Sequence, residues 1–345
     1  MSAVLDCSIG EGGGSIVRIA TALAAATNSP LKLVNIRSNR PNPGLRSQHL
    51  EAINALRQLS GFEVVGANLG SKELSFDKYG KRRNDATVKI NTAGSISLVA
   101  QAVQYYALNN GSQIILNIQG GATHGKWAPS VEFVENVTFK ILEKMNKLIT
   151  VDINQYGYYP KGGAQSRFIF KPHNKIIPLD LTEKGTLEEI SVFSTVSSHL
   201  RKRNVAERQL ETFAKLTKQP EKIVPHINYV NSNSPGTGLT IVNKYSTGAI
   251  KGCFTPGEKS ITAEQVGEMC WEKWKDLENN GAAVDSFTAD QLIVAMALAE
   301  GNSTITVDSL TNHTKTNIDL IQKFISVTIN VKKRNGYYHV TIKPH

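Results

Sequence analysis

The residues best suited to chemistry lie in the last quarter of the chain, where a histidine stands among hydroxyl and amide side chains. His313 comes just ahead of a predicted helix in which Ile318, Ile321 and Ile325 repeat at helical spacing. A helix start presents unpaired N–H groups and the positive end of the dipole, which favours a bound phosphate. A neutral imidazole is nucleophilic, so the position suits attack on a phosphate. On chemistry alone, a surface or capping histidine is the more common explanation.

Asp290 and Gln291 form a polar pair at the beginning of the preceding predicted helix. The apolar residues that follow fall at i, i+3, i+4 and i+7 and predict one buried face: Leu292, Ala295, Met296 and Ala299. The pair therefore belongs among the candidate site residues. A helix cap is the alternative role for Asp290, because aspartate often accepts a hydrogen bond from the first turn of a helix.

A glycine-rich stretch, residues 10–14, separates a short predicted strand from the first predicted helix. Glycines let backbone N–H groups approach a phosphate closely, but a tight turn explains the stretch equally well. The spacing is neither that of a dinucleotide fingerprint nor that of a Walker loop. Glu11 would repel a phosphate unless a cation lay between them. Magnesium suits that place because it binds few protein carboxylates and completes its shell with water and phosphate oxygens.

Two arginines follow the next predicted strand, in a loop that two prolines stiffen. The forked guanidinium groups of Arg37 and Arg40 suit bidentate contacts with phosphate, and a rigid loop would hold them in place. Gln48 and His49 complete the polar stretch at the next helix start. Arg18 interrupts an otherwise apolar helix, and either a solvated surface position or a phosphate contact explains it.

These segments together resemble the RNA 3′-terminal phosphate cyclases, and the similarity runs from about Leu5 to Ile342. In that family a histidine in the setting His-x-x-Thr-Asn becomes adenylated. His313, Thr316 and Asn317 fill this pattern. The resemblance therefore implies that His313 is the catalytic nucleophile.

The resemblance also implies roles for the other polar residues. The family's matching glutamate lies beside the nucleotide and its metal, which makes Glu11 the expected ligand of Mg²⁺ or Mn²⁺. The residues implied to bind nucleotide or phosphate are Glu11, Arg18, Arg37, Arg40, Gln48, His49, Asp290 and Gln291. Three weaker candidates for packing on adenine, for which core packing is the more common role, are Phe254, Pro129 and Phe287.

Three positions depart from the usual family pattern. Ala164 follows two glycines where the family has a third, and Asn39 stands where glycine is common. His124 lies in a Thr-His-Gly-Lys stretch that replaces a usual Thr-Asp. The last change could alter the preference for nucleotide or metal, and none of the three involves His313.

The composition is that of a globular protein, and its charge favours an anionic partner. The 345 residues include 39 Lys and Arg against 29 Asp and Glu, a net charge of +10. A basic protein favours an anionic partner, and nucleic acid fits as well as any. RNA with a 3′-phosphate end and ATP are the partners that the resemblance implies, and a homo-oligomer remains possible.

Compartment signals are weak but agree with one another. The three cysteines are widely spaced and form no Cys-x-x-Cys, so they are expected to be reduced thiols. No window approaches the ~18 continuous apolar residues of a membrane span, and the chain does not begin with a basic stretch and an apolar run. We therefore expect a cytoplasmic protein outside the membrane.

Self-comparison of the sequence reveals one unit used three times. A helix and strand at 14–36 recur at 94–118 and, more faintly, at 290–307. Each copy continues with a second amphipathic helix and two extended segments. The predicted order is strand, helix, strand, helix, strand, strand, and helices that alternate with strands in this way predict a layered α/β fold. The family is described in the same way, as three units like the C-terminal domain of bacterial translation initiation factor three.

Residues 182–280 break the repeat before its third copy. They contain two helical patterns, 204–216 and 262–277, and a strand-like run at 238–242. About 100 residues suffice for a small domain. The predicted division is a three-repeat domain of residues 1–181 and 281–345 and an inserted α/β domain of residues 182–280, for which the family suggests a thioredoxin-like outline.

The leading hypothesis is an ATP-dependent RNA 3′-phosphate cyclase. His313 would attack the α-phosphate of ATP, AMP would pass to the RNA 3′-phosphate, and the vicinal 2′-hydroxyl would displace AMP to give a 2′,3′-cyclic phosphate. One rival is a non-catalytic RNA-binding factor of ribosomal-RNA maturation with the same fold, against which His313 argues. The other is an enolpyruvyl transferase, which only the repeat architecture supports.

Overall fold

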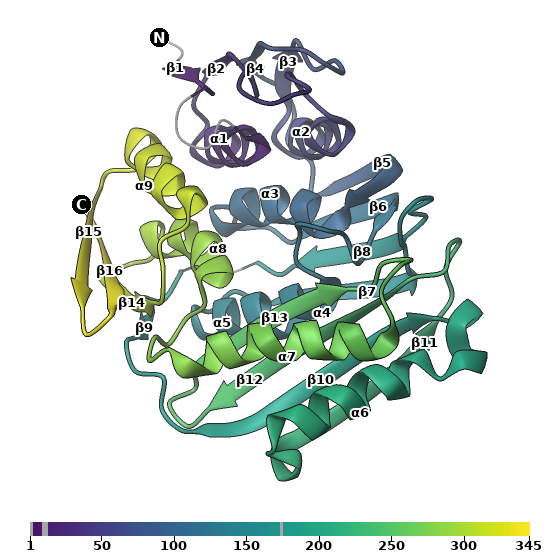
Figure 1. Ribbon diagram of the computed structural model, residues 1–345. Coiled ribbons are helices and arrows are strands. Elements are labelled where there is room, and N and C mark those ends of the chain that lie inside the picture. Colours follow the sequence, from purple (N-terminus) through teal and green to yellow (C-terminus); the bar gives the residue numbers. More distant parts are fainter. Residues whose placement is uncertain (1–2, 9–12, 173–174) are drawn as a thin grey trace.

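The computed structural model describes residues 3–8, 13–172 and 175–345, whose strands form four four-stranded sheets (Figure 1). Three of the sheets belong to the repeated units, and the fourth belongs to the segment that interrupts them. The α/β layered fold expected from the sequence is confirmed.

The first unit pairs two helices with one sheet. Its first helix has apolar residues on nearly every face and is buried, because it packs against other helices as well as its own sheet. The sheet order is β1-β2-β4-β3. The elements are β1 (Ala3–Asp6), α1 (Gly14–Thr27), β2 (Leu31–Val34), α2 (Ser47–Ser60), β3 (Phe62–Val65) and β4 (Leu74–Tyr79).

The second unit repeats this order, with its second helix divided by a π-helical stretch. Residues along β5 alternate between exposed and buried, as expected of a strand with one face on the core. The sheet order is β5-β6-β8-β7. The elements are β5 (Asp85–Ser95), α3 (Ile96–Leu108), β6 (Ile114–Ala122), α4 (Val131–Phe133), η1 (Val134–Thr138), α5 (Phe139–Lys144), β7 (Ile149–Gln155) and β8 (Gln165–Phe170).

The third unit has the same topology, β9-β14-β16-β15, but its first strand lies before the inserted segment. The elements are β9 (Asp180–Leu181), α8 (Ser286–Ala297), β14 (Ser303–Val307), α9 (Asn312–Phe324), β15 (Val327–Arg334) and β16 (Tyr337–Pro344). In every unit the first two strands pair in parallel and the others antiparallel. The insertion therefore interrupts the third unit after its first strand rather than preceding the whole unit.

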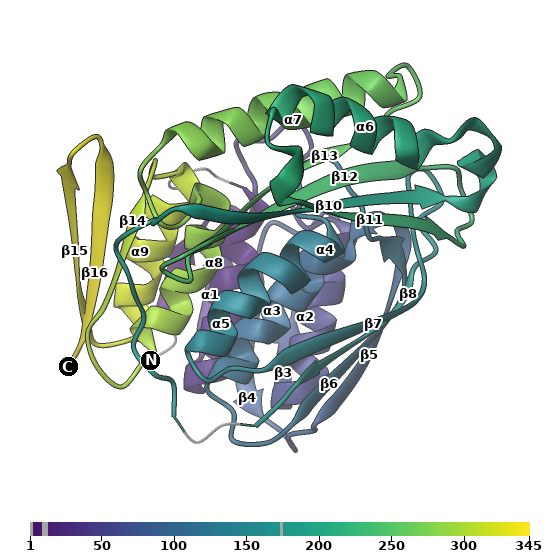
Figure 2. The same ribbon diagram turned by 90° about the horizontal axis from the view of Figure 1, so that it is seen from below.

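The inserted segment forms a mixed sheet of order β11-β10-β12-β13 with two helices on one face (Figure 2). A Cβ on Gly267 of α7 would lie 2.8 Å from the carbonyl oxygen of Gln209 in α6, so glycine permits the close approach of these helices. The elements are β10 (Leu187–Ser197), η2 (Ser198–Arg203), α6 (Val205–Thr217), η3 (Pro220–Lys222), β11 (Ile223–Val230), β12 (Thr237–Tyr245), β13 (Ile250–Pro256) and α7 (Ala263–Asn279).

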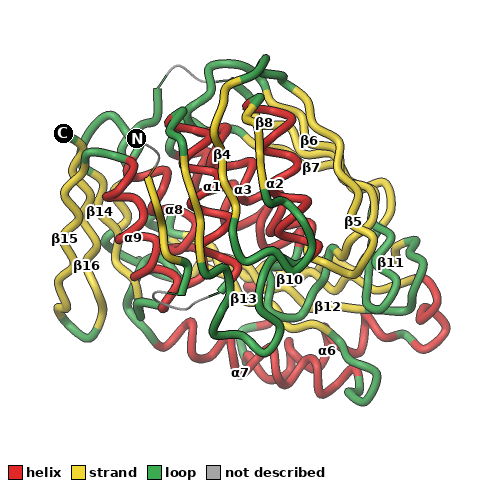
Figure 3. Tube along the Cα trace, turned by 90° about the horizontal axis from the view of Figure 1, so that it is seen from above, coloured by secondary structure: helices red, strands yellow, loops and turns green. Residues whose placement is uncertain are grey.

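The helices of the three units meet in the centre of the molecule, and their sheets lie outside them (Figures 2 and 3). One continuous apolar core joins the three units, and a smaller core lies beneath α6 and α7. This arrangement brings the first turns of helices from different units together, which positions the site described below. Within the described ranges, the helices are too short or too polar to span a membrane.

Candidate functional site

The predicted nucleophile lies where the first turns of α9 and α1 meet. His313 is the second residue of α9 and not just ahead of it, because Thr311 is the N-cap and its hydroxyl accepts from the Thr314 N–H at 2.9 Å. The Nδ1 atom of His313 lies 3.0 Å from the hydroxyl oxygen of Ser15, in the first turn of α1. Two helix starts thus present their positive ends to one place, which favours an anion.

Asp290, in α8, accepts hydrogen bonds from the start of α9. The Thr311 hydroxyl donates to both carboxylate oxygens of Asp290, at 2.8 and 3.0 Å, and the Thr314 hydroxyl donates to one of them. Asp290 is buried in the interior of α8, whose N-cap is Asp285. The capping alternative for Asp290 is therefore wrong for its own helix. The side chain instead holds the cap residue of the helix that carries His313.

The backbone of Asp290 adds two further contacts. Its carbonyl oxygen accepts from the Asn317 amide at 3.1 Å and from the Tyr105 hydroxyl at 3.3 Å. Tyr105 belongs to α3 of the second unit, so three helices converge on this residue. Gln291, the other member of the predicted pair, is buried beside it.

His49 is built into the wall of the site. The imidazole is 3% exposed, and its Nδ1 accepts from the backbone N–H of Arg46 at 3.1 Å. A Cβ at Gly14 would collide with its Nε2, so glycine is required at the start of α1. Burial, followed by the charges of Arg18, Arg37 and Arg46, lowers the pKa of His49 to about 3. The ring is therefore neutral, and since Nδ1 accepts, its proton is on Nε2, facing α1.

The predicted arginines occupy different environments around this histidine. Arg18 is 8% exposed, so the solvated alternative for it is wrong. Arg37 has a left-handed backbone (φ 53°), and its Nη1 donates to the carbonyl oxygens of Asn42 and Gly44 at 2.7 and 3.0 Å. That guanidinium helps to close its own loop. Arg40, from the same loop, is exposed.

The arginines form a cluster of like charge. Burial and the charges of Arg46 and Arg40 lower the pKa of Arg37. The charges of Arg18, Arg37 and Arg46 all act on His49. Such a concentration of positive charge favours a phosphate or another anion.

Gln48 connects this region to the second unit. A Cβ on Gly94, just before α3, would lie 3.3 Å from the Cβ of Gln48. A Cβ on Gly125 would in turn lie 3.9 Å from the Cβ of Ser95. The loop between β6 and α4, which contains Pro129, therefore lies beside the end of β5, where Gly94 approaches Gln48.

The three candidates for adenine packing lie in separate elements. Phe287 is 69% exposed in the first turn of α8, and Pro129 is half-buried before α4. Phe254, in β13, is half-buried with its ring centre 5.6 Å from that of His124. Among the described residues, no ring contact joins Phe254 to Phe287. Their role toward adenine stays a prediction.

His124, a departure from the family pattern, is buried between the second unit and the inserted sheet. Its Nε2 lies 2.9 Å from Glu132 Oε2, and its ring stacks on Tyr158 at 5.3 Å. The Thr195 hydroxyl donates to the other Glu132 oxygen at 2.8 Å. Burial opposes ionisation of Glu132, but the contacts with His124 and Thr195 prevail and its pKa lies below the usual range. This histidine holds two parts of the fold together.

The other two departures are accommodated by the backbone. The Ala164 N–H donates to the Gly121 carbonyl oxygen at 3.1 Å, and its own carbonyl accepts from Gly120 at 2.6 Å. The Asn39 amide donates to the carbonyl oxygen of Ser8 at 3.1 Å. Both residues therefore make contacts that their positions allow without glycine.

Glu11, the predicted metal ligand, lies outside the described residues, as do the glycines on either side of it. Among the residues that are described, no group of three or more His, Cys, Asp or Glu side chains could hold a metal ion. The Mg²⁺ or Mn²⁺ site therefore stays a prediction.

Sequence reasoning missed Ser15, Thr311 and Thr314. The spacing of the two threonines is that of an N-cap and its third following residue, which is a signal that could have found them. Ser15 is 298 residues from its partner His313, and a single sequence contains no sign of that contact.

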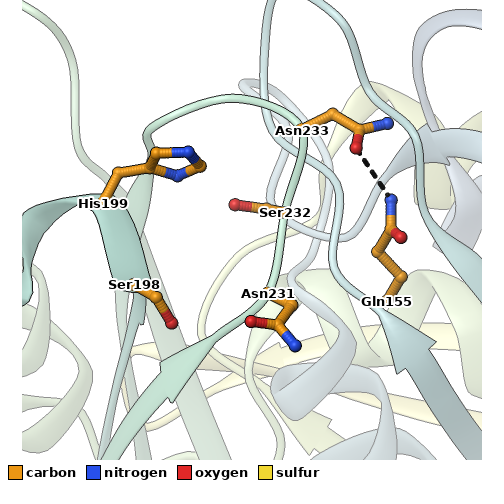
Figure 4. Close-up of a pocket in the computed structure, with 6 residues that line it drawn as sticks. All are labelled: Gln155, Ser198, His199, Asn231, Ser232 and Asn233. Carbon is orange, nitrogen blue, oxygen red and sulfur yellow. Dashed lines mark hydrogen bonds between the residues drawn. The ribbon is translucent and has the colours of Figure 1, made fainter.

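A separate open pocket of about 450 Å³ lies between the end of β7 and the inserted segment (Figure 4). None of the sequence-predicted site residues lines it. The Gln155 amide, at the end of β7, donates to Asn233 Oδ1 of the inserted segment at 3.2 Å. All of its lining residues are polar: Gln155, Ser198, His199, Asn231, Ser232 and Asn233.

Known proteins resemble this chain over nearly its whole length. A family profile described as RNA 3′-terminal phosphate cyclase matches residues 9–331. A protein of that name from Methanococcoides burtonii is 37% identical over 340 residues, 98% of this chain and 99% of that one. Another from Caldivirga maquilingensis is 36% identical over 352 residues, 99% of this chain and 97% of that one.

A solved structure, that of the enolpyruvyl transferase NikO from Streptomyces tendae, has a TM-score of 0.38 and 9% sequence identity, and covers 99% of this chain and 48% of that chain. A likeness at this level carries no argument about function. The sequence matches, in contrast, extend from the glycine-rich stretch through the helix that carries His313. The chain belongs to the RNA 3′-terminal phosphate cyclase family.

Proposed function

We propose that the protein uses ATP to convert an RNA 3′-phosphate into a 2′,3′-cyclic phosphodiester, through a covalent intermediate between His313 and AMP. Family membership supports the reaction in general, because the relatives are named for it. The observation that carries the route is the contact of His313 Nδ1 with Ser15 at two helix starts. Because Nδ1 contacts Ser15, we propose Nε2 as the nitrogen that attacks ATP.

The first step forms a phosphorus–nitrogen bond. The lone pair of His313 Nε2 attacks the α-phosphorus of ATP, the bond to the bridging oxygen breaks, and pyrophosphate leaves. In the proposed tautomer the proton is on Nδ1 and is donated to the Ser15 hydroxyl oxygen, 3.0 Å away, so the imidazole can carry the positive charge that attack creates. The arginine cluster supplies donors for the charge on the phosphate oxygens.

The second step takes place at the α-phosphorus of AMP, and the third takes place at the RNA 3′-phosphorus. An oxygen of the RNA 3′-phosphate attacks the α-phosphorus, the phosphorus–nitrogen bond breaks, and neutral imidazole is restored. The RNA 2′-hydroxyl then attacks the 3′-phosphorus, loses its proton and displaces AMP. The products are AMP, pyrophosphate and the cyclic end. A divalent metal bound at Glu11 would supply charge neutralisation at the ATP phosphates.

The test is incubation with ATP labelled at the α-phosphate, followed by denaturing electrophoresis. We expect a protein-bound label that is acid-labile and alkali-stable, as for a phosphoramidate. A protein that binds RNA but acquires no label and leaves the 3′-phosphate unchanged would favour the non-catalytic RNA-binding alternative. Omission of Mg²⁺, replacement by Mn²⁺, and the Glu11→Ala variant test the metal separately.

The order of steps can be tested with a modified RNA. An oligonucleotide with a 3′-phosphate and a terminal 2′-O-methyl group lacks the final nucleophile, so it should accept AMP and then stall. The adenylated end would accumulate and be detected by its mass. Labelled enzyme that transfers no AMP to this RNA would contradict the order proposed.

We also propose that residues 182–280 form a domain of their own beside one of residues 1–181 and 281–345. The inserted segment has an apolar core of its own under α6 and α7, which supports the division, and the other face of its sheet joins the core of the three units through Val242, Tyr245, Ala249 and Ile250. Limited proteolysis should cut near both boundaries before it cuts within either part. Early cleavage only inside the inserted segment would contradict it.

A further inference from the structure

Trp127 is an exposed aromatic side chain that the proposed chemistry does not use. It lies in the loop between β6 and α4, and 91% of its surface is exposed. Its backbone is left-handed, with φ 63°. A bulky residue rarely adopts this conformation, which disfavours any side chain beyond glycine, asparagine or aspartate. An exposed indole on a strained backbone contributes little to folding, which indicates a functional role for Trp127.

The loop that carries Trp127 is fixed on both sides. Before it, Lys126 Nζ lies 2.8 Å from Glu258 Oε1, which ties the loop to the segment after β13. After it, the hydroxyl oxygens of Ser130 and Thr240 lie 2.7 Å apart, in a buried contact with β12. The indole is thus presented by a loop with anchors on the inserted segment. A preorganised aromatic face of this kind binds a planar ligand at low entropic cost.

The same loop borders the candidate site. A Cβ on Gly125 of this loop would lie 3.9 Å from Ser95, the last residue of β5, and a Cβ on its neighbour Gly94 would lie 3.3 Å from Gln48. Pro129, two residues after Trp127, is one of the residues predicted to pack on adenine. The loop that carries Trp127 therefore runs beside the end of β5 that approaches Gln48, a residue predicted to bind nucleotide or phosphate.

Its neighbour indicates the chemistry of the ligand. Lys126 Nζ lies 5.4 Å from the centre of the Trp127 ring, so a cation stands beside an aromatic face. A nucleotide offers the matching pair, a flat base and an anionic phosphate. Single-stranded RNA is recognised in this way, with unstacked bases placed on aromatic side chains and the backbone near basic groups.

We propose that Trp127 stacks on a base of the RNA substrate at or next to its 3′ end. The identity of the RNA rests on the proposed function, but the stacking is measured by binding alone. RNA is favoured over the adenine of ATP because Trp127 stands on an exposed rim, where a longer chain can pass. Stacking of the ATP base on Trp127 is an outcome that the experiment can reveal.

The experiment uses tryptophan fluorescence of the full-length protein. Of the three tryptophans, Trp274 is buried and Trp271 is half-buried under Lys275, so Trp127 is the one open to a ligand. The protein is titrated with a single-stranded RNA oligonucleotide ending in a 3′-phosphate and, separately, with ATP. RNA should quench the wild type, and Trp127→Phe should remove most of that quenching.

Affinity for the same RNA gives the second measurement. Trp127→Ala should weaken RNA binding about 5- to 150-fold, the range expected when one base loses its stacking partner. Trp127→Phe keeps an aromatic face and should fall in between. Trp271→Phe is the matched control, since it removes another indole and should leave RNA affinity unchanged. Thermal melting of each variant reports folding, and Trp127→Gly removes the ring while relieving the left-handed strain.

The outcomes separate this inference from the proposed function. Unchanged RNA affinity in folded Trp127→Ala would overturn the inference. Equal quenching by ATP, with an equal loss of self-labelling in the variant, would assign the ring to ATP and also overturn it. If wild-type protein acquires no label from ATP, the proposed function fails, while RNA quenching and its loss in Trp127→Phe would still support stacking.

Discussion

The starts of α2 and α9 each carry a histidine in the first turn, but the structure uses the two residues in opposite ways. His49 is 3% exposed and its Nδ1 accepts the Arg46 N–H, so it helps to cap its own helix. His313 is half-buried, and Thr311 caps its helix instead. The capping alternative considered for His313 therefore describes His49.

The difference teaches that a helix start does not by itself make a histidine a nucleophile. The ring must also be accessible, and its attacking nitrogen must not serve the backbone. At α2 the pKa of about 3 keeps His49 neutral with its proton on Nε2, a donor but no nucleophile through that atom. At α9 the Nδ1 of the half-buried His313 contacts Ser15 instead of the backbone, and Nε2 is the nitrogen that we propose attacks ATP.

The largest expected effect comes from replacing each of the two histidines in turn. His313→Ala should lose self-labelling with ATP by at least ~10³-fold, because it removes the nucleophile that we propose carries AMP. His49→Gln should still be labelled, at a reduced rate. The measurement is the initial rate of label incorporation, with circular dichroism to confirm folding. Comparable labelling of His313→Ala would remove the proposed distinction between the two helix starts.

The next effect concerns what holds α9 in place. Asp290→Ala removes the acceptor of the Thr311 and Thr314 hydroxyls, so the first turn of α9 loses its attachment to α8. We expect labelling to fall about 10- to 100-fold, as when an outer partner of a reactive group is removed. α2 has no counterpart of this attachment among its described contacts.

A double-mutant cycle with Thr314→Val separates positioning from direct contact with the nucleotide. If Asp290 acts through α9, the two changes should be far less than additive in the logarithm of the labelling rate. Strict additivity would instead indicate that Asp290 affects ATP independently of Thr314.

A third effect concerns His49 and the pH dependence of the protein's stability. Its pKa is about 3 in the folded protein and ~6.5 when unfolded, so the unfolded state binds more protons between these values. Stability is therefore lost as pH falls below ~6.5. Between pH 7 and pH 5 the loss from this residue should be about 2 kcal/mol. His49→Gln lacks it, so urea unfolding at the two pH values should show a smaller decrease for the variant.

Asp285 contributes a pH dependence of stability opposite in sign to that of His49, and this contribution cancels when the two proteins are compared. Burial raises its pKa to about 6, so its contribution to stability falls as pH rises from ~3.8 toward 6. Because wild type and His49→Gln share this residue, the difference between them isolates His49. Equal pH dependence in the two proteins would show that the imidazole is not held neutral.

The sequence predicted the features that repeat along it or lie close together. The three units were visible because each has two amphipathic helices and short apolar strands, and the helix of His313 was visible from its isoleucines. The strand β9 was not, since two residues, Asp180 and Leu181, show no periodicity. Its place in the third sheet depends on pairing with β14, more than 100 residues later.

The candidate site was predicted as a set of residue types but not as an arrangement. Sequence alone could not tell that Arg37 closes its own loop, that His49 is sealed beneath Gly14, or that Asp290 holds Thr311. Each of these facts depends on burial or on a contact between distant segments. Trp127 was overlooked for the same reason, because exposure and a left-handed backbone leave no mark on a single sequence.

The smallest expected effect is at Ser15, the contact that distinguishes His313 from His49 most directly. Ser15→Ala removes one hydrogen bond, which contributes about 1 kcal/mol and therefore about fivefold in the rate of labelling. The loss should appear at saturating ATP with KM unchanged, because the hydroxyl orients the ring rather than binding ATP. Ser15→Thr keeps the hydroxyl and should recover most of the rate. A change in KM alone, with no recovery in Ser15→Thr, would mean that the residue shapes the ATP site and that another group orients His313.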